Sequence, residues 1–197
     1  KKGRLKYLRK EIPRALEQSL DGLRRVSHIV GAMKDFAHPS QGERTTVDLH
    51  HLIDNTITVS RNEWKYVADV ERDFDESLMS IPCYRDELGQ ALLNMIVNAA
   101  HAIEDTEHEG KGTIRITTRR GETHAEVHVG DNGKGIPPAQ LERIFEPFFT
   151  TKPQGKGTGQ GLAIAHDVVV TKHGGALDVL SSVGEGTTFI MRLPLGE

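Results

Sequence analysis

A short acidic and glycine-rich stretch, residues 131–137, constrains the fold more than any other part of the sequence. It follows an alternating run, residues 124–129, that is typical of a strand, so Asp131 is expected at a strand end. The glycines that follow allow a backbone turn to approach a flat ligand closely. Asp-Asn-Gly also forms ordinary hairpin turns, but here Pro137-Pro138 and a short helical pattern follow instead of a returning strand. This order favours a binding site over a simple turn.

A second glycine-rich stretch, residues 155–161, leads directly into a helical pattern that ends near Val170. Bare backbone amides at the positive end of a helix are suited to hold phosphate. The alternative is a flexible loop, which the immediate start of the helix disfavours. Lys152 and Lys156 could bring positive charge to a triphosphate, although Lys156 is equally consistent with a solvated position. The irregular connection over residues 137–158 is typical of a lid.

A strong helical pattern covers residues 85–103, and Asn94 and Asn98 share one of its faces. A single amide on a mostly buried helix would most simply bond a neighbouring loop. Two amides in register favour a polar pocket or an oxygen-liganded Mg²⁺. The positions expected to point inward are Leu88, Leu92, Leu93, Ile96, Val97 and Ala100.

The remaining patterns predict an α/β fold, a two-layer sandwich with one mixed sheet and about three helices on one face. A helix is predicted over residues 47–59, with Asp48 as its cap, and Ile81-Pro82 is expected to break the pattern. Strands are predicted over residues 65–74, 112–118, 123–129, 176–181 and 187–193.

An N-terminal helical arm is predicted from residue 12 to residue 37, where apolar side chains recur every three or four residues. The arm is either a helix of the globular core or one arm of a dimerising hairpin. The linker that follows favours the hairpin.

Composition restricts the class of protein. A net charge of -3 disfavours binding to nucleic acid or to an anionic membrane. A single cysteine, Cys83, excludes an internal disulfide framework and fits a reducing compartment, so a cytoplasmic location is expected. No apolar run is long enough to span a bilayer, but a start at Lys1 suggests a piece of a longer protein that could be membrane-anchored. His124 and His128 share a strand face, where solvated side chains are a better interpretation than a metal site.

These pieces, in this order, strongly resemble the nucleotide-binding domain of sensor histidine kinases, which belongs with gyrase-like, Hsp90-like and MutL-like ATPases of the Bergerat-type fold. The match spans roughly residues 45–195, so residues 45–197 are expected to form the catalytic ATP-binding domain. Residues 23–39 resemble the second helix of the family's dimerisation and phosphotransfer hairpin, which assigns residues 1–41 to that hairpin. The matching segments are residues 94–99, 131–135, 145–149, 155–161 and 184–189.

The resemblance implies ATP and Mg²⁺ as ligands. Asp131 would accept a hydrogen bond from the adenine amino group, Asn98 would bind Mg²⁺, and Asn94 would lie beside the reacting end. Ile136, Leu162 and Phe189 would form the walls of the base pocket, and His101 stands where many kinases have Lys or Arg. The implied catalytic residues are Asn94, Asn98 and Lys152. The implied binding residues are Asn94, Asn98, His101, Asp131, Gly133, Gly135, Ile136, Lys152, Gly157, Thr158, Gly159, Gln160, Gly161, Leu162, Thr187 and Phe189.

The implied reaction is transfer of the γ-phosphoryl group of ATP to a histidine, followed by relay to an aspartate in the receiver domain of a response regulator. Hydrolysing relatives carry Glu where this chain has Asn94, and an amide cannot accept a proton from water. His28 and His38 do not fit the acceptor pattern, so the acceptor is expected upstream of residue 1. A homodimer through the hairpin is expected in the full-length protein, and no contact with nucleic acid or membrane is expected from this fragment. The alternatives are a hydrolysing ATPase and a non-catalytic nucleotide-binding module.

Overall fold

The computed structural model describes residues 11–12, 43–78, 80–106, 110–152 and 157–196. The predicted arm beyond residue 12, together with His28 and His38, lies outside the described residues. The chain divides into two compact units. One consists of Gly42–Phe149 and Gly159–Glu197, and the other consists of Lys1–Gln41 and Thr150–Thr158. We call the first the sheet unit and describe it by itself.

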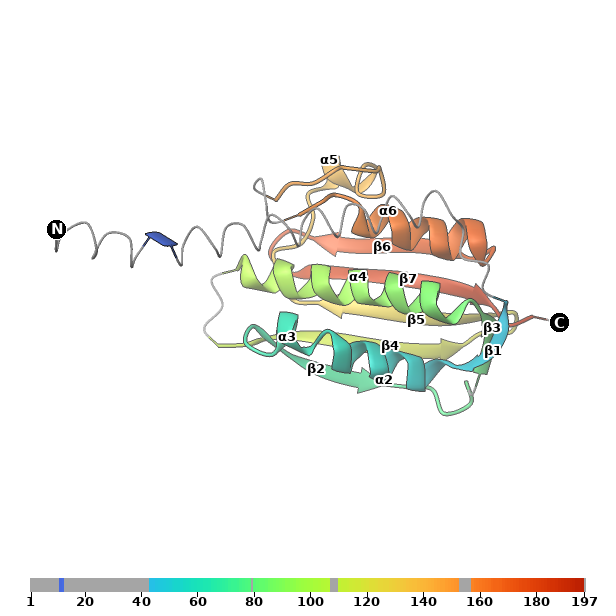
Figure 1. Ribbon diagram of the computed structural model, residues 1–197. Coiled ribbons are helices and arrows are strands. Elements are labelled where there is room, and N and C mark those ends of the chain that lie inside the picture. Colours follow the sequence, from blue (N-terminus) through green and yellow to red (C-terminus); the bar gives the residue numbers. More distant parts are fainter. Residues whose placement is uncertain (1–10, 13–42, 79, 107–109, 153–156, 197) are drawn as a thin grey trace. The chain divides into compact units, whose positions relative to one another are not determined.

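The sheet unit is built on one five-stranded sheet with the strand order β2-β4-β5-β7-β6 (Figure 1). Strand β2 runs parallel to β4, and the other neighbours are antiparallel. The predicted mixed sheet is therefore confirmed. The bounds are β2 Ala68–Asp73, β4 Gly112–Arg120, β5 His124–Asp131, β6 Ala176–Ser182 and β7 Gly186–Pro194.

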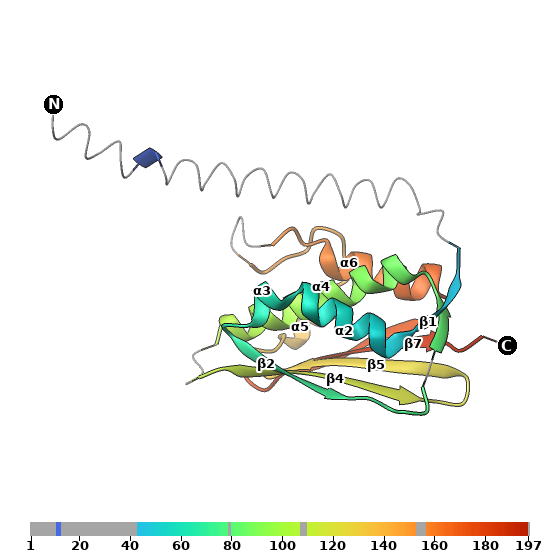
Figure 2. The same ribbon diagram turned by 60° about the horizontal axis from the view of Figure 1, so that its bottom comes forward.

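Helices cover one face of this sheet, as predicted. Figures 1 and 2 show α2, α4 and α6 side by side on the same face. Helix α4 is central. Of its predicted inward positions, Leu88, Leu92, Ile96 and Ala100 are fully buried, whereas Leu93 and Val97 are only half-buried. Burial of these side chains against the sheet supplies the main driving force for folding of the unit. The helices are α2 Leu49–Val59, α3 Arg61–Trp64, α4 Arg85–Glu104, α5 Pro138–Leu141 and α6 Gly161–His166, which continues as the π-helix η1 Asp167–Lys172.

Two local predictions were wrong. Residues around Pro82 form strand β3 (Ser80–Cys83), which pairs with β1 (Thr45–Asp48) in a separate two-stranded sheet. A proline is tolerated there because β3 pairs with β1 alone and its other edge needs no donor. The helix predicted over residues 47–59 starts later, at Leu49. Asp48 does cap it, because its carboxylate accepts from the amide of His51 at 2.9 Å.

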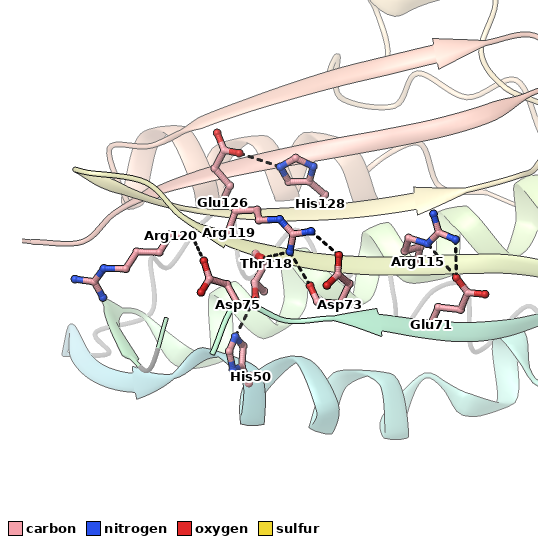
Figure 3. Close-up of polar contacts among 10 residues, drawn as sticks. All are labelled: His50, Glu71, Asp73, Asp75, Arg115, Thr118, Arg119, Arg120, Glu126 and His128. Carbon is pink, nitrogen blue, oxygen red and sulfur yellow. Dashed lines mark hydrogen bonds and ion pairs between the residues drawn. The ribbon is translucent and has the colours of Figure 1, made fainter. Parts of the chain in front are cut away.

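The opposite face of the sheet carries charged side chains (Figure 3). Arg115 of β4 pairs with Glu71 of β2 at 2.8 Å, and His128 bonds Glu126 within β5 at 3.0 Å. Exposed pairs of this kind contribute little stability, but their charges show that this face of the sheet is exposed to solvent. The sandwich therefore has one helical layer. In the part of the chain that the structure describes, no helix is both long and apolar enough to cross a membrane.

Candidate functional site

Asp131 is the last residue of β5, and its side chain lies on the side of the sheet that faces the helices, as do the buried Val127 and Val129. Its carboxylate accepts from the amide of Gly133 at 2.8 Å. Burial raises the pKa of Asp131 to about 6, although hydrogen bonds from the amides of Gly133 and Thr187 oppose this. At neutral pH the site therefore contains a mostly ionised, partly desolvated acceptor.

The turn after Asp131 packs against the C-terminal end of α4. The amide of Lys134 donates to the carbonyl of Ala102 at 3.1 Å, and the Lys134 ammonium pairs with Asp105 at 2.5 Å. A Cβ atom at Gly133 would lie 2.5 Å from the carbonyl carbon of Ala102, so only glycine fits there. The position of Asp131 is thus fixed by the helix as well as by the sheet.

The turn between β6 and β7 packs against the same segment from the other side. The amide of Gly184 donates to the carbonyl of Lys134 at 2.8 Å. A Cβ atom at Gly135, whose φ is 70°, would lie 2.0 Å from the carbonyl oxygen of Ser182. The glycines after Asp131 therefore have packing roles within the protein. Their close approach to a ligand stays a prediction.

Sequence reasoning missed Ser181, whose hydroxyl connects these two turns. It accepts from the amide of Ile136 at 2.8 Å and lies 2.9 Å from both the carbonyl oxygen of Gly186 and the hydroxyl of Thr187. The available signal was the alternation of β6, where Leu177 and Val179 precede Ser181 at the inward-facing positions. A polar residue in such a register needs hydrogen-bond partners.

The predicted apolar walls are placed in the core or at its edge. Phe189 of β7 is 4% exposed, and its ring lies 6.4 Å from that of Phe145, centroid to centroid. Ile136 and Leu162 are half-buried and pack against the core cluster. The predicted Thr187, two residues before Phe189, is buried and lies opposite Asp131 in the pairing of β5 with β7.

The amide of Asn94 joins α4 to the start of α6. Its Nδ2 donates to the carbonyl of Gly161 at 3.1 Å, and its Oδ1 accepts from Gln90 at 3.3 Å. This is the bond to a neighbouring segment that the sequence left open as an alternative. Asn98 lies one turn further along the same face, and His101 follows on the same helix; both are half-buried.

The side chains near the site decide which metal ion it could bind. Among the described residues, no three His, Cys, Asp or Glu side chains gather closely enough to hold a metal ion. Mg²⁺ commonly takes few protein ligands and completes its octahedral shell with water and substrate phosphate. An amide oxygen such as that of Asn98 suits this hard cation, so the residues present fit Mg²⁺ delivered with a polyphosphate.

The glycine-rich loop is divided between the two units. Gly159, Gln160, Gly161 and Leu162 belong to the sheet unit, in which a Cβ atom at Gly159 would lie 2.4 Å from the backbone of Phe148. The other unit contains the predicted site residues Lys152, Gly157 and Thr158. There the amide of Lys152 donates to the hydroxyl of Thr150 at 3.2 Å. Gly155 and Lys156 lie outside the described residues.

Comparison with known proteins identifies relatives of this arrangement. Residues 83–197 match the family described as histidine kinase-, DNA gyrase B-, and HSP90-like ATPase. The chain is 35% identical over 172 residues to the sensor histidine kinase ZraS of Escherichia coli (strain K12), and 34% identical over 192 residues to the two-component sensor PprA of Pseudomonas aeruginosa. These matches cover 87% and 96% of the chain. They cover only 35% and 20% of the relatives, so the chain spans about a third or less of their length.

Solved structures with the same fold include the catalytic domain of histidine kinase ThkA, at 31% identity and a TM-score of 0.65, covering 78% of this chain and 98% of that one. Full-length ShkA in complex with AMPPNP matches at 26% identity and a TM-score of 0.75, covering 92% and 38%. ThkA in complex with the response regulator protein TrrA matches at 25% identity and a TM-score of 0.66, covering 88% and 49%.

Proposed function

The chain belongs to the family of histidine kinase-, DNA gyrase B-, and HSP90-like ATPases, and from this premise we propose that it is the ATP-binding catalytic region of a two-component sensor histidine kinase. In this proposal residues 45–197 are the catalytic domain, and residues 1–41 are the second helix of the dimerisation and phosphotransfer hairpin. The similarity to ZraS and PprA supports the kinase assignment, because ZraS is named a sensor histidine kinase and PprA a two-component sensor.

The observation that carries the proposal is the setting of Asp131. Its half-buried carboxylate lies at the end of β5, and the turn that follows it is bonded both to α4 and to the turn between β6 and β7. A fixed acceptor of this kind suits an exocyclic amino group, which donates hydrogen bonds, and the apolar Ile136, Leu162 and Phe189 suit the faces of a purine. Asp131 would therefore bind the amino group of adenine, with Gly133, Gly135 and Thr187 beside it.

The phosphate end of the ligand is assigned to α4 and the glycine-rich loop. Asn98 would hold Mg²⁺, which neutralises developing charge on the phosphoryl group when it is bound. Asn94 and His101 would lie beside the phosphates. Within the sheet unit, the backbone of residues 159–162 would complete the cradle. Phosphate binding by Lys152, Gly157 and Thr158 stays an expectation from the resemblance. Phosphoryl transfer needs mainly positioning and charge neutralisation, which these groups supply.

The proposed reaction moves the γ-phosphoryl group to a histidine. The bond from the γ-phosphorus to the β,γ-bridging oxygen breaks, a phosphorus–nitrogen bond to imidazole forms, and ADP leaves. Imidazole brings its own nucleophilic lone pair, whereas water needs a base that the amide of Asn94 cannot provide. The structure of ThkA with TrrA supports a response regulator as the next acceptor, through an aspartate of its receiver domain. We further propose a homodimer through the hairpin and a cytoplasmic location for this region.

The proposal is tested by calorimetric titration with AMPPNP, with and without Mg²⁺. Wild-type chain should bind the analogue, and Asp131→Asn should weaken binding by roughly tenfold or more, because a hydrogen bond to a charged group contributes about 1.5–3 kcal/mol. Asn98→Ala should reduce only the binding that depends on Mg²⁺.

Asp69→Asn is the matched control, because this carboxylate is exposed and pairs with Lys111 on the other face of the sheet. It should leave affinity unchanged. A wild-type chain that shows no heat of binding at millimolar analogue would refute the assignment.

A further inference from the structure

Only one placement of the protons makes all three polar contacts of the Ser181 hydroxyl hydrogen bonds. Its oxygen lies 2.8 Å from the amide nitrogen of Ile136 and 2.9 Å from both the carbonyl oxygen of Gly186 and the hydroxyl oxygen of Thr187. An amide can only donate and a carbonyl can only accept, and a hydroxyl has one proton. In that placement the Ser181 proton goes to the carbonyl of Gly186, and Thr187 donates its own proton to Ser181.

This pattern fixes the orientation of the Thr187 hydroxyl. With its proton directed at Ser181, the Thr187 oxygen has only lone pairs to offer to any other group. Thr187 is 4% exposed and lies directly opposite Asp131 in the β5–β7 ladder, on the same face of the sheet. The Asp131 carboxylate and the Thr187 oxygen are then neighbouring acceptors.

We propose that Ser181 is a positioning residue that makes the base site selective for a purine with an amino group at position 6 over one with an oxo group there. This inference rests on the proposed function. A 6-amino group donates to both acceptors, whereas a 6-oxo group would present a third acceptor to them. A buried site built around hydrogen bonds rejects an analogue that leaves its polar groups unpaired. Through the Ile136 amide, Ser181 also holds one wall of the base pocket.

The test compares the affinities for Mg-ATP and Mg-ITP, because inosine differs from adenosine at position 6 of the base and in the proton that its N1 consequently carries. We expect wild-type chain to prefer ATP. In Ser181→Ala the Thr187 hydroxyl is free to rotate and donate, so the ratio of the two affinities should fall by roughly fivefold to tenfold, the size of one net hydrogen bond. Ser181→Thr retains the hydroxyl and should retain the ratio.

Two further measurements separate positioning from general stability. Ser182→Ala is the matched control, because the side chain of Ser182 lies on the opposite face of β6, and it should leave both affinities unchanged. Thr187→Val removes the oriented hydroxyl, so adding Ser181→Ala to it should not lower the ratio further, as a double-mutant cycle would show. Should Ser181→Ala not fold, Ser181→Cys is the substitute, because a thiol donates only weakly, and it should also lower the ratio.

The outcomes are distinct. An unchanged ratio in Ser181→Ala would overturn the inference, and so would an equal loss of affinity for both triphosphates, which indicates a structural role alone. If the wild-type chain prefers ATP to ITP and Ser181→Ala shows the same ratio of affinities, only this inference fails and the proposed function stands. If wild-type chain binds neither triphosphate, the proposed function fails and this inference fails with it.

Discussion

Asp131 carries its charge in a place where burial works against ionisation. Burial raises its pKa to about 6 from the ordinary value of 3.8, and the amides of Gly133 and Thr187 offset only part of the cost. A ligand amino group that donates to the carboxylate would stabilise the ionised form. Ligand binding and the ionisation of Asp131 are therefore coupled.

We predict that affinity for AMPPNP falls as the pH is lowered from 7.5 to 5. Below a pKa of about 6 the carboxylate takes up a proton, and affinity should drop by up to about tenfold per pH unit from this group alone. Calorimetric titration at several pH values measures the effect. In Asp131→Asn, which binds weakly at every pH, this component of the slope should be absent. An identical slope in wild type and variant would assign the pH dependence to other groups, such as the phosphates.

At the scale of elements, the two turns that hold the site are packed backbone against backbone. Gly135 and Gly184 both have positive φ, 70° and 83°. A Cβ atom at Gly135 would lie 2.0 Å from the carbonyl oxygen of Ser182, whereas one at Gly184 would have no neighbour within 4 Å. Substituting Gly184 therefore tests backbone strain alone, whereas substituting Gly135 tests backbone strain together with a steric clash.

We predict that Gly184→Ala costs about 1–2 kcal/mol of unfolding free energy, the price of a left-handed conformation for alanine. Gly135→Ala should cost about 3 kcal/mol or more, because the turns must also separate. Chemical denaturation measures both. Gly135→Ala should in addition lose nucleotide affinity, because Ile136 moves with the turn. Equal destabilisation by the two substitutions would contradict the close packing of the turns.

The buried side chain of His173 links the end of η1 to the start of α4. His173, 3% exposed, follows η1. Its Nδ1–H donates to the carbonyl of Val168 at 2.7 Å, and its Nε2 accepts from the amide of Tyr84, just before α4, at 3.0 Å. The neutral imidazole alone can make both bonds. Burial lowers the pKa of His173 below 6.5, and the positive charges of Arg44 and Lys172 lower it further. The hydrogen bond to the carbonyl of Val168 and the negative charge of Glu87 act in the opposite direction.

We predict that this link is lost in acid. Because the folded-state pKa of His173 is below the unfolded value of 6.5, the unfolded chain binds more protons, and stability falls as the pH drops below 6.5. Asp131 has the opposite sign, since its raised pKa adds stability as the pH falls from about 6 toward 3.8. Denaturation at pH 7.5 and 5.5 should therefore be compared in an Asp131→Asn background. In that background, the chain with His173→Gln should lose less unfolding free energy between pH 7.5 and 5.5 than the chain that retains His173. An equal loss in the two chains would refute the assignment.

The parts predicted from sequence are those whose signal is local. Helix α4 follows from its own periodicity, and Asp131 follows from an alternating run that ends in glycines. The missed features depend on distant partners. Ser181 contacts Ile136, 45 residues away, and His173 contacts Tyr84, 89 residues away. Pro82 was misassigned for the same reason, since its strand exists only through pairing with β1.

At the scale of the whole molecule, the chain should bind ATP without using it rapidly. The sheet unit supplies Asp131, Asn94 and Asn98, but Asn94 cannot act as a base for water. Neither His28, followed by Ile29, nor His38, followed by Pro39, fits the acceptor pattern of the kinases that the sequence resembles. We predict that the chain incubated with γ-labelled Mg-ATP releases little labelled phosphate and carries no acid-labile, alkali-stable label. Label of that kind on wild-type chain, lost in His28→Ala, would show that the acceptor lies within it. Steady release of phosphate that Asp131→Asn abolishes would instead favour a hydrolysing ATPase.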